Sequence, residues 1–137
     1  MKFGTDEKGF FKLLCASPAE YLEKVNLAYA DKYGFTLMKA METELGGDAG
    51  NAGLFMLGMK LKPYLTIAKL LKSAVKGFGT DELLLTSCLI RYQPILKSVM
   101  EAYIEEYGET LQDVVKSETR GDYEKLLIKI LDSAIGN

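Results

Sequence analysis

The stretch KGFGTDE, residues 76–82, sets two glycines and a phenylalanine directly before the charged start of a helix. A shorter copy, KFGTDE, occupies residues 2–7. The two copies of GTDE are 75 residues apart, and further along the chain the offset is 74, so that the pair YG at 33–34 recurs at 107–108. Self-similarity at a fixed spacing is the sequence signature of a repeated structural unit. The chain therefore carries an internal duplication.

Each copy has the period of an amphipathic helix. In the second copy Val99, Tyr103 and Tyr107 recur at every fourth position and form one apolar face. Pro94 and Gly108 stand where such a helix starts and stops. The equivalent stripe of the first copy consists of Tyr21, Leu22, Val25, Ala28, Tyr29 and Tyr33.

These patterns predict an all-α fold. The second copy has room for five helices, at about 63–75, 80–91, 94–108, after 110 and at 122–134. The first copy has room for four, because the chain begins directly before its motif. We therefore expect a truncated repeat at 1–61 and a complete repeat at 62–137.

The missing helix predicts an exposed apolar surface in the first repeat. Phe10, Phe11 and Leu14 are expected to line a partly open groove there. Large apolar grooves seldom stay exposed on a monomer, so we expect the chain to self-associate through this repeat.

Composition excludes several classes of protein. The formal net charge of −2, with 17 basic and 19 acidic residues, provides no basic surface for nucleic acid. The longest apolar run, LFMLGM at 54–59, is far shorter than the roughly 20 residues that a spanning helix needs. The N-terminus lacks the pattern of a secretion signal. We expect a soluble, cytoplasmic protein.

The reactive side chains of common enzymes are scarce. The sequence has no histidine, and it offers no pairing of a nucleophile with a base or a phosphate-binding loop. Cys15 and Cys88 lie in apolar helical stretches and are expected to be buried free thiols. We expect a binding protein rather than an enzyme.

The glycine motif itself has two interpretations. In the simpler one, Thr80 caps the following helix while Asp81 and Glu82 face the positive end of its dipole, and Asp48 and Asp122 cap the last helix of each copy. Capping does not explain Gly77 and Gly79, which allow a tight loop to turn several carbonyl oxygens toward one point.

Converging carbonyl oxygens suit a hard cation. Ca²⁺ takes six to eight oxygen ligands at about 2.3–2.6 Å, usually including a bidentate carboxylate. The duplication supplies that carboxylate, since Glu44 and Glu118 occupy equivalent positions after the two motifs. Such a site would leave coordination positions open to a phosphate oxygen of another molecule. Phe78, and Phe3 in the first copy, could then insert among lipid headgroups.

At this point the sequence resembles the annexin family. The pattern Gly-x-Gly-Thr-Asp-Glu, followed about 40 residues later by Glu-x-x-Gly-Asp and a leucine-rich helix, is similar to an annexin repeat. The order of the two copies is similar to the third and fourth repeats of a four-repeat annexin. The resemblance implies a superhelical arrangement of five-helix repeats.

The resemblance also implies calcium-dependent binding to acidic phospholipid membranes, peripherally at their cytoplasmic face. The ligands it implies for the second copy are the backbone oxygens of Val75, Gly77 and Gly79 and the carboxylate of Glu118. For the first copy they are Lys2, Gly4 and Glu44. Secondary sites would use Thr80 with Glu82, and Thr5 with Glu7.

The sequence also departs from the family pattern. Lys2 replaces a motif glycine, which predicts a weak first site. Ser17 and Tyr92 stand near positions where the family has an arginine, and five glycines between 46 and 58 predict a weakened last helix in the first copy. These departures favour an alternative function, in which the chain is an annexin-related structural protein associated with the cytoskeleton.

Overall fold

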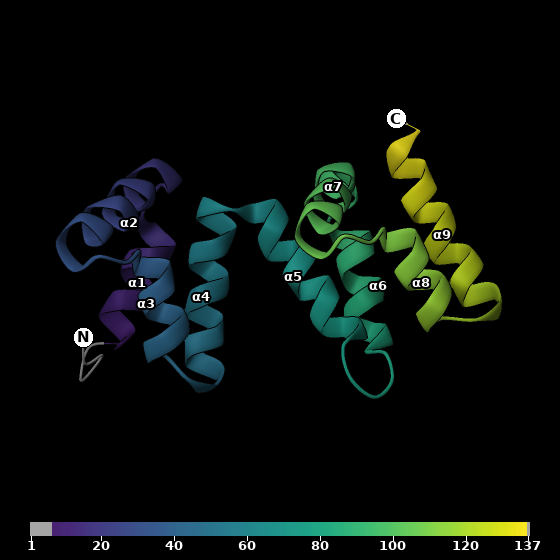
Figure 1. Cartoon of the computed structure of the whole chain (residues 1–137), viewed down its shortest axis with the longest axis horizontal. Helices are drawn as coiled ribbons and strands as arrows, with labels where there is room; N and C mark the ends of the chain where they lie inside the picture. Colours follow the sequence, from purple (N-terminus) through teal and green to yellow (C-terminus); the bar gives the residue numbers. More distant parts are fainter. Residues whose placement is uncertain (1–6, 137) are drawn as a thin grey trace. The chain divides into compact units, whose positions relative to one another are not determined.

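The computed structural model describes residues 7–136, and these residues form helices and connecting turns without a strand (Figure 1). The all-α prediction is confirmed. The elements are α1 (Glu7–Ala16), α2 (Ala19–Tyr33), α3 (Leu37–Glu44), α4 (Gly47–Leu61), α5 (Pro63–Val75), α6 (Glu82–Arg91), the 3₁₀ turn η1 (Gln93–Ile95), α7 (Leu96–Tyr107), α8 (Leu111–Glu118) and α9 (Gly121–Ile135). Within this described part, no helix is both long and apolar enough to cross a bilayer.

The chain divides into two compact units, one ending at Pro63 and the other starting at Tyr64. Helices α1–α4 form the first unit, and α5 begins the second, which continues to α9. In each unit a short helix packs along the last one, α3 on α4 and α8 on α9. The helices α1–α4 therefore correspond in order to α6–α9, and α5 has no counterpart among the described helices of the first unit.

The duplication extends to local geometry. Gly34 and Gly108 end equivalent helices with φ of +83° and +71°, a conformation that glycine adopts without strain. Thr36 and Thr110 cap the next helices, each accepting a hydrogen bond from the backbone N–H three residues later at 3.1 Å. Equivalent local sequence has therefore produced equivalent local structure.

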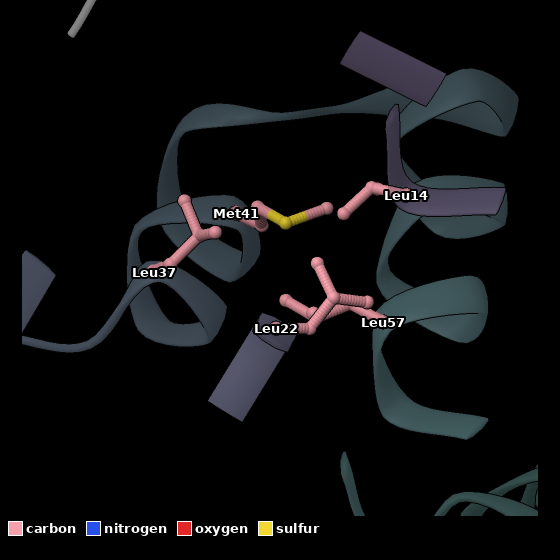
Figure 2. Close-up of a cluster of buried hydrophobic side chains, with 5 residues drawn as sticks. All are labelled: Leu14, Leu22, Leu37, Met41 and Leu57. Carbon is pink, nitrogen blue, oxygen red and sulfur yellow. The ribbon is translucent and has the colours of Figure 1, made fainter. Parts of the chain in front are cut away.

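The core of the first unit is a cluster of five buried side chains from α1–α4. Figure 2 shows Leu14, Leu22, Leu37, Met41 and Leu57 converging in this cluster. Helix α4 approaches it closely because Gly53 has no side chain. A Cβ atom there would lie 2.5 Å from a ring carbon of Phe11 and 3.2 Å from the methyl carbon of Met41.

Two glycines of the first copy have a role in packing besides their low helix propensity. Helix α4 runs unbroken from Gly47 to Leu61. Gly50 is also buried, and a Cβ atom there would lie 2.8 Å from the backbone of Leu45. These two glycines lower helix propensity, but they stand where a methyl group does not fit, so they permit the close packing of α4.

The predicted groove differs from the observed surface. Phe11 packs on Gly53, and Phe10 and Phe11 are both partly buried against the core cluster. Leu14 borders an apolar pocket of about 260 Å³ between α1 and α4, which is lined by Leu14, Cys15, Phe55, Met56, Met59 and Lys60. Of the three predicted groove residues, only Leu14 therefore contributes to this pocket.

Three local predictions were wrong. The residues that precede α4 and α9 are Gly46 and Arg120, so Asp48 and Asp122 lie in the first turns instead of capping them. There they still face the positive end of the helix dipole. Cys15 is exposed, whereas Cys88 is buried as expected and its burial raises the pKa of the thiol. Both cysteines are free.

A lysine of α4 makes a polar contact with the turn that follows α1. The Lys60 Nζ atom donates a 3.0 Å hydrogen bond to the backbone oxygen of Ser17, just after α1 ends. A cation is favoured there because carbonyl oxygens at a helix C-terminus carry partial negative charge. In the second unit the Arg91 guanidinium lies 6.0 Å from the centre of the Tyr92 ring.

Candidate functional site

The loop between α5 and α6 depends on its two glycines. Gly77 and Gly79 have φ of +100° and +82°, a region that other residues adopt only with strain. A Cβ atom at either position would meet nothing within 4 Å, so conformation rather than space requires glycine. The backbone N–H of Asp81 donates to the Ala74 oxygen at 2.8 Å and closes the base of the loop.

Phe78 stands between these glycines with its side chain fully exposed. Its neighbours Lys76, Gly77 and Gly79 are exposed as well. The side chain therefore has no place in the core of the second unit, and the loop presents an aromatic ring to solvent.

Thr80 connects this loop to a residue 38 positions later. Its hydroxyl donates to the Glu118 carboxylate at 3.1 Å, and the backbone oxygen of Glu118 lies at 3.4 Å. The interpretation of Thr80 as the helix cap was wrong. Asp81 caps α6 instead by accepting from the Leu84 N–H at 3.0 Å, and α6 begins at Glu82 rather than at residue 80.

Glu118 is the last residue of α8, and its side chain is exposed. The turn that follows is held firmly. Thr119 is buried and its hydroxyl donates to the Val115 oxygen at 2.6 Å. Arg120 donates from Nη1 to the backbone oxygens of Lys116, Ser117 and Thr119, at 2.8–3.2 Å. These bonds satisfy carbonyl groups at the end of α8 and fix the backbone from which Glu118 extends.

Tyr123 holds the start of α6 against α9. Its hydroxyl donates to the Glu82 backbone oxygen at 3.1 Å and lies 2.6 Å from the hydroxyl of Thr86. Since Tyr123 donates to Glu82, the Thr86 hydroxyl is the donor in the second bond. The exposed side chain of Glu82 is thereby kept at the same end of the unit as Thr80 and Glu118.

The first unit repeats only part of this arrangement. Glu44 ends α3 just as Glu118 ends α8, and it is also exposed. At the offset of 74, Leu45, Gly46 and Ala49 replace Thr119, Arg120 and Tyr123, so the groups that brace the second site have no equivalents here. Lys2, Phe3, Gly4 and Thr5 lie outside the described residues, and Glu7 opens α1 with a side chain that is likewise not described.

Sequence reasoning missed the bracing residues Thr119, Arg120 and Tyr123. The one available signal was their position within the stretch ETRGDY at 118–123, whose Thr, Arg and Tyr the first copy does not reproduce. Among the described residues, no group of three or more His, Cys, Asp or Glu side chains could hold a metal ion. The predicted site is of another kind, since it combines backbone oxygens with a single carboxylate.

The chemistry of the loop nonetheless fits a hard cation. The second unit brings a glycine loop and a glutamate together at one end through the bond between Thr80 and Glu118. Both glycines have the left-handed conformation, and the site is exposed to solvent. An accessible carboxylate beside a loop with two glycines suits an ion with oxygen ligands and open coordination positions.

Comparisons with known proteins agree with these features. The annexin family model matches residues 1–54 and 67–130. Annexin A13 of Schistosoma japonicum is 31% identical over 131 residues, which are 95% of this chain and 37% of that protein. Annexin A13 of Mus musculus is 31% identical over 132 residues, which are 96% of this chain and 41% of that protein.

Solved structures give the same result. Annexin III superposes with a TM-score of 0.85 at 29% identity, over 95% of this chain and 41% of that one. Calcium-bound annexin (Sm)1 superposes with a TM-score of 0.78 at 30% identity, over 87% of this chain and 34% of that one. The chain thus spans about two fifths or less of the length of these relatives. The match of the family model to most of the chain, together with the duplicated helices, shows that the protein belongs to the annexin family.

Proposed function

We propose that this chain binds acidic phospholipid membranes in a calcium-dependent manner through the second unit. Annexins as a family are known for calcium-dependent phospholipid binding. The observation that carries the proposal is the hydrogen bond between Thr80 and Glu118, which joins the glycine loop to the one carboxylate that the predicted site requires.

The proposed ligands are the backbone oxygens of Val75, Gly77 and Gly79 and the carboxylate of Glu118. When bound, Ca²⁺ would supply positive charge and open coordination positions for a lipid phosphate. Thr80 donates to the carboxylate and restricts its orientation before the ion arrives, which lowers the entropic cost of binding. Thr80 and Glu82 are the proposed ligands of a secondary site.

Phe78 is the proposed membrane contact of the second unit. Its ring is already free of the protein core, so no packing is lost when it enters the headgroup region. Aromatic rings are favoured at that depth of a membrane. Phe78 would therefore add affinity for vesicles without contributing a ligand to the ion.

The site of the first repeat is proposed to be weaker. It would use Lys2, Gly4 and Glu44, with Thr5 and Glu7 in a secondary site and Phe3 at the membrane. Glu44 lacks equivalents of the side chains that brace Glu118, which supports a lower affinity. We accordingly propose that the protein binds membranes rather than catalysing a reaction. It would bind peripherally at their cytoplasmic face. The proposed repeats span residues 1–61 and 62–137.

Two further predictions stay open. The alternative function, a structural protein of the cytoskeleton with weakened calcium sites, is favoured by Lys2 in the first motif and by the substitutions that follow Glu44. Self-association through the first repeat also remains a prediction, and sedimentation equilibrium at micromolar concentration tests it.

Sedimentation with liposomes tests the main proposal. Vesicles containing phosphatidylserine should carry the chain into the pellet in millimolar calcium, and they should release it in excess EGTA. Vesicles of phosphatidylcholine alone are the matched control and should leave the chain in the supernatant. Sedimentation that ignores calcium would contradict the proposal, and failure to sediment with acidic vesicles would favour the cytoskeletal alternative.

A further inference from the structure

Leu83 exposes an apolar side chain close to the glycine loop. Among the described large apolar side chains, only Phe78 is more exposed than Leu83, whose exposed fraction is 80%. The next in order, Leu27, is 58% exposed. An apolar side chain stabilises a fold through the surface that it removes from water, and Leu83 removes little. The packing of the second unit therefore does not account for this leucine.

The direction of Leu83 follows from the helix that carries it. The buried residues of α6 are Leu85, Cys88 and Leu89. Successive residues of an α-helix are about 100° apart around its axis, so Leu83 lies about 200° from Leu85, on the side away from the core. Ile90, seven positions after Leu83, returns to that side and is 54% exposed. The outer side of α6 thus carries an exposed apolar residue near each end.

These two residues differ in their distance from the candidate site. Helix α6 begins at Glu82, so Leu83 lies in its first turn. The rise of about 1.5 Å per residue puts Ile90 about 10 Å further along the helix. The loop that carries Phe78 projects from the end of the unit at which α6 begins (Figure 1). Leu83 and Phe78 therefore belong to the same end of the second unit.

Hydrogen bonds on both sides of Leu83 fix its backbone. On one side the Leu84 N–H donates to the Asp81 carboxylate at 3.0 Å. On the other side the backbone oxygen of Glu82 accepts from the Tyr123 hydroxyl at 3.1 Å. The first turn of α6 is thus held in place without any contribution from the Leu83 side chain, which stays available for another contact.

The first copy has a lysine at the equivalent position. The two motifs are 75 residues apart, so Leu83 corresponds to Lys8, and both residues follow the sequence GTDE. Lys8 is exposed on α1 as Leu83 is on α6. A charged residue at the same exposed position shows that the fold of the repeat does not require leucine there. The leucine belongs to the copy whose site also has the bracing residues.

We propose that Leu83 is a second membrane contact, which enters the headgroup region of an acidic membrane together with Phe78. The role of Leu83 depends on the proposed calcium-dependent membrane binding, and it adds an apolar contact that lies outside the glycine motif. A lipid surface is the favoured occupant because Leu83 lies at the same end of the unit as the exposed ring of Phe78 and the carboxylate of Glu118. Both apolar side chains are largely exposed, so they can leave water with little loss of protein contacts.

The sequence has no tryptophan, which allows a direct test by fluorescence. Leu83→Trp places a single tryptophan at the proposed contact. Ile90→Trp is the matched control, because it places one on the same side of α6 near the other end. The probe is a vesicle of phosphatidylserine and brominated phosphatidylcholine in millimolar calcium. We expect a blue shift and bromine quenching for Leu83→Trp, both reversed by EGTA, and neither change for Ile90→Trp.

Tryptophan itself favours membrane interfaces, so a polar variant is needed as well. Glutamine keeps a high helix propensity. Because a partly buried leucine contact is lost, Leu83→Gln should weaken vesicle binding in calcium by about three- to tenfold. Ile90→Gln should change it by less than about twofold. Without vesicles, calorimetry should give Leu83→Gln the calcium affinity of the unaltered chain, and circular dichroism checks the fold.

Sedimentation of the unaltered chain is measured first. If the chain does not sediment with acidic vesicles in calcium, the membrane function and the role of Leu83 are both wrong. If it sediments, absence of quenching in Leu83→Trp, or equal vesicle binding by Leu83→Gln, overturns the role of Leu83 and leaves the membrane function standing. Equal quenching of Ile90→Trp would overturn it too, because the contact would not be confined to this end. A lower calcium affinity of Leu83→Gln without vesicles would show that the residue acts on the ion rather than on lipid.

Discussion

Replacement of Glu118 by glutamine tests the proposed calcium site most directly. Glutamine has nearly the same shape and keeps a side-chain oxygen that can accept from Thr80, whose hydroxyl lies 3.1 Å from the carboxylate. The side chain is exposed, so the substitution buries no new polar group. The change therefore removes one negative charge while the loop and α8 keep their structure.

The size of the effect follows from the charge and exposure of the site. A divalent ion and a unit negative charge about 2.4 Å apart attract each other by about 3 kcal/mol in water. Dehydration of the ion and the carboxylate offsets part of this energy. We expect a net loss of at least tenfold in calcium-dependent vesicle affinity, or about 1.4 kcal/mol.

The assay is sedimentation with phosphatidylserine vesicles across a calcium titration. Glu105→Gln provides the control, because it removes the same charge from an exposed position on α7, outside the proposed site. A general loss of negative charge should alter both variants alike. If Glu118→Gln binds vesicles as tightly as the unaltered chain at every calcium concentration, Glu118 is not a ligand.

Three further predictions address the membrane mechanism and the packing. Titration calorimetry should give a calcium Kd on the order of 10⁻⁴–10⁻³ M that falls when acidic vesicles are present. Equal calcium affinity with and without vesicles would contradict phosphate bridging. Phe78→Ser should weaken vesicle binding without changing calcium affinity in the absence of vesicles. Gly53→Ala should lower the free energy of unfolding measured in urea. A methyl group 2.5 Å from the Phe11 ring costs about 1–3 kcal/mol, which exceeds the roughly 1 kcal/mol gained in helix propensity. Asn51→Ala, on the exposed side of α4, is the control and should be neutral or slightly stabilising. Burial raises the pKa of Tyr103 from 10.0 to about 12, so the unfolded chain loses this proton first and the free energy of unfolding should fall as pH rises through that interval. Tyr103→Phe should reduce this slope, and Tyr107, whose pKa burial also raises, should account for part of what is left. Because the buried Tyr103 hydroxyl has no hydrogen-bond partner, the substitution should not lower stability at neutral pH.

Local features of the sequence determined the helices and the duplication. Apolar periodicity, Pro94, Gly34 and Gly108 mark helix positions that the structure reproduces within a few residues. Such signals are reliable because helix periodicity, turn conformation and capping depend on residues only three or four positions apart. The motif residues also identified the family, which the comparisons confirm.

Contacts between distant residues required the tertiary structure. Threonine is a common helix cap, yet the Thr80 hydroxyl donates a hydrogen bond to Glu118, and Asp81 caps the helix instead. Two neighbouring side chains could serve as the cap, and only the position of α8 beside the loop decides between them. Likewise, the clearance around Gly53 is set by a ring from another helix, which no spacing along α4 reveals. Side-chain periodicity specifies which face of a helix is apolar, but the packing of other helices decides how much of that face is buried.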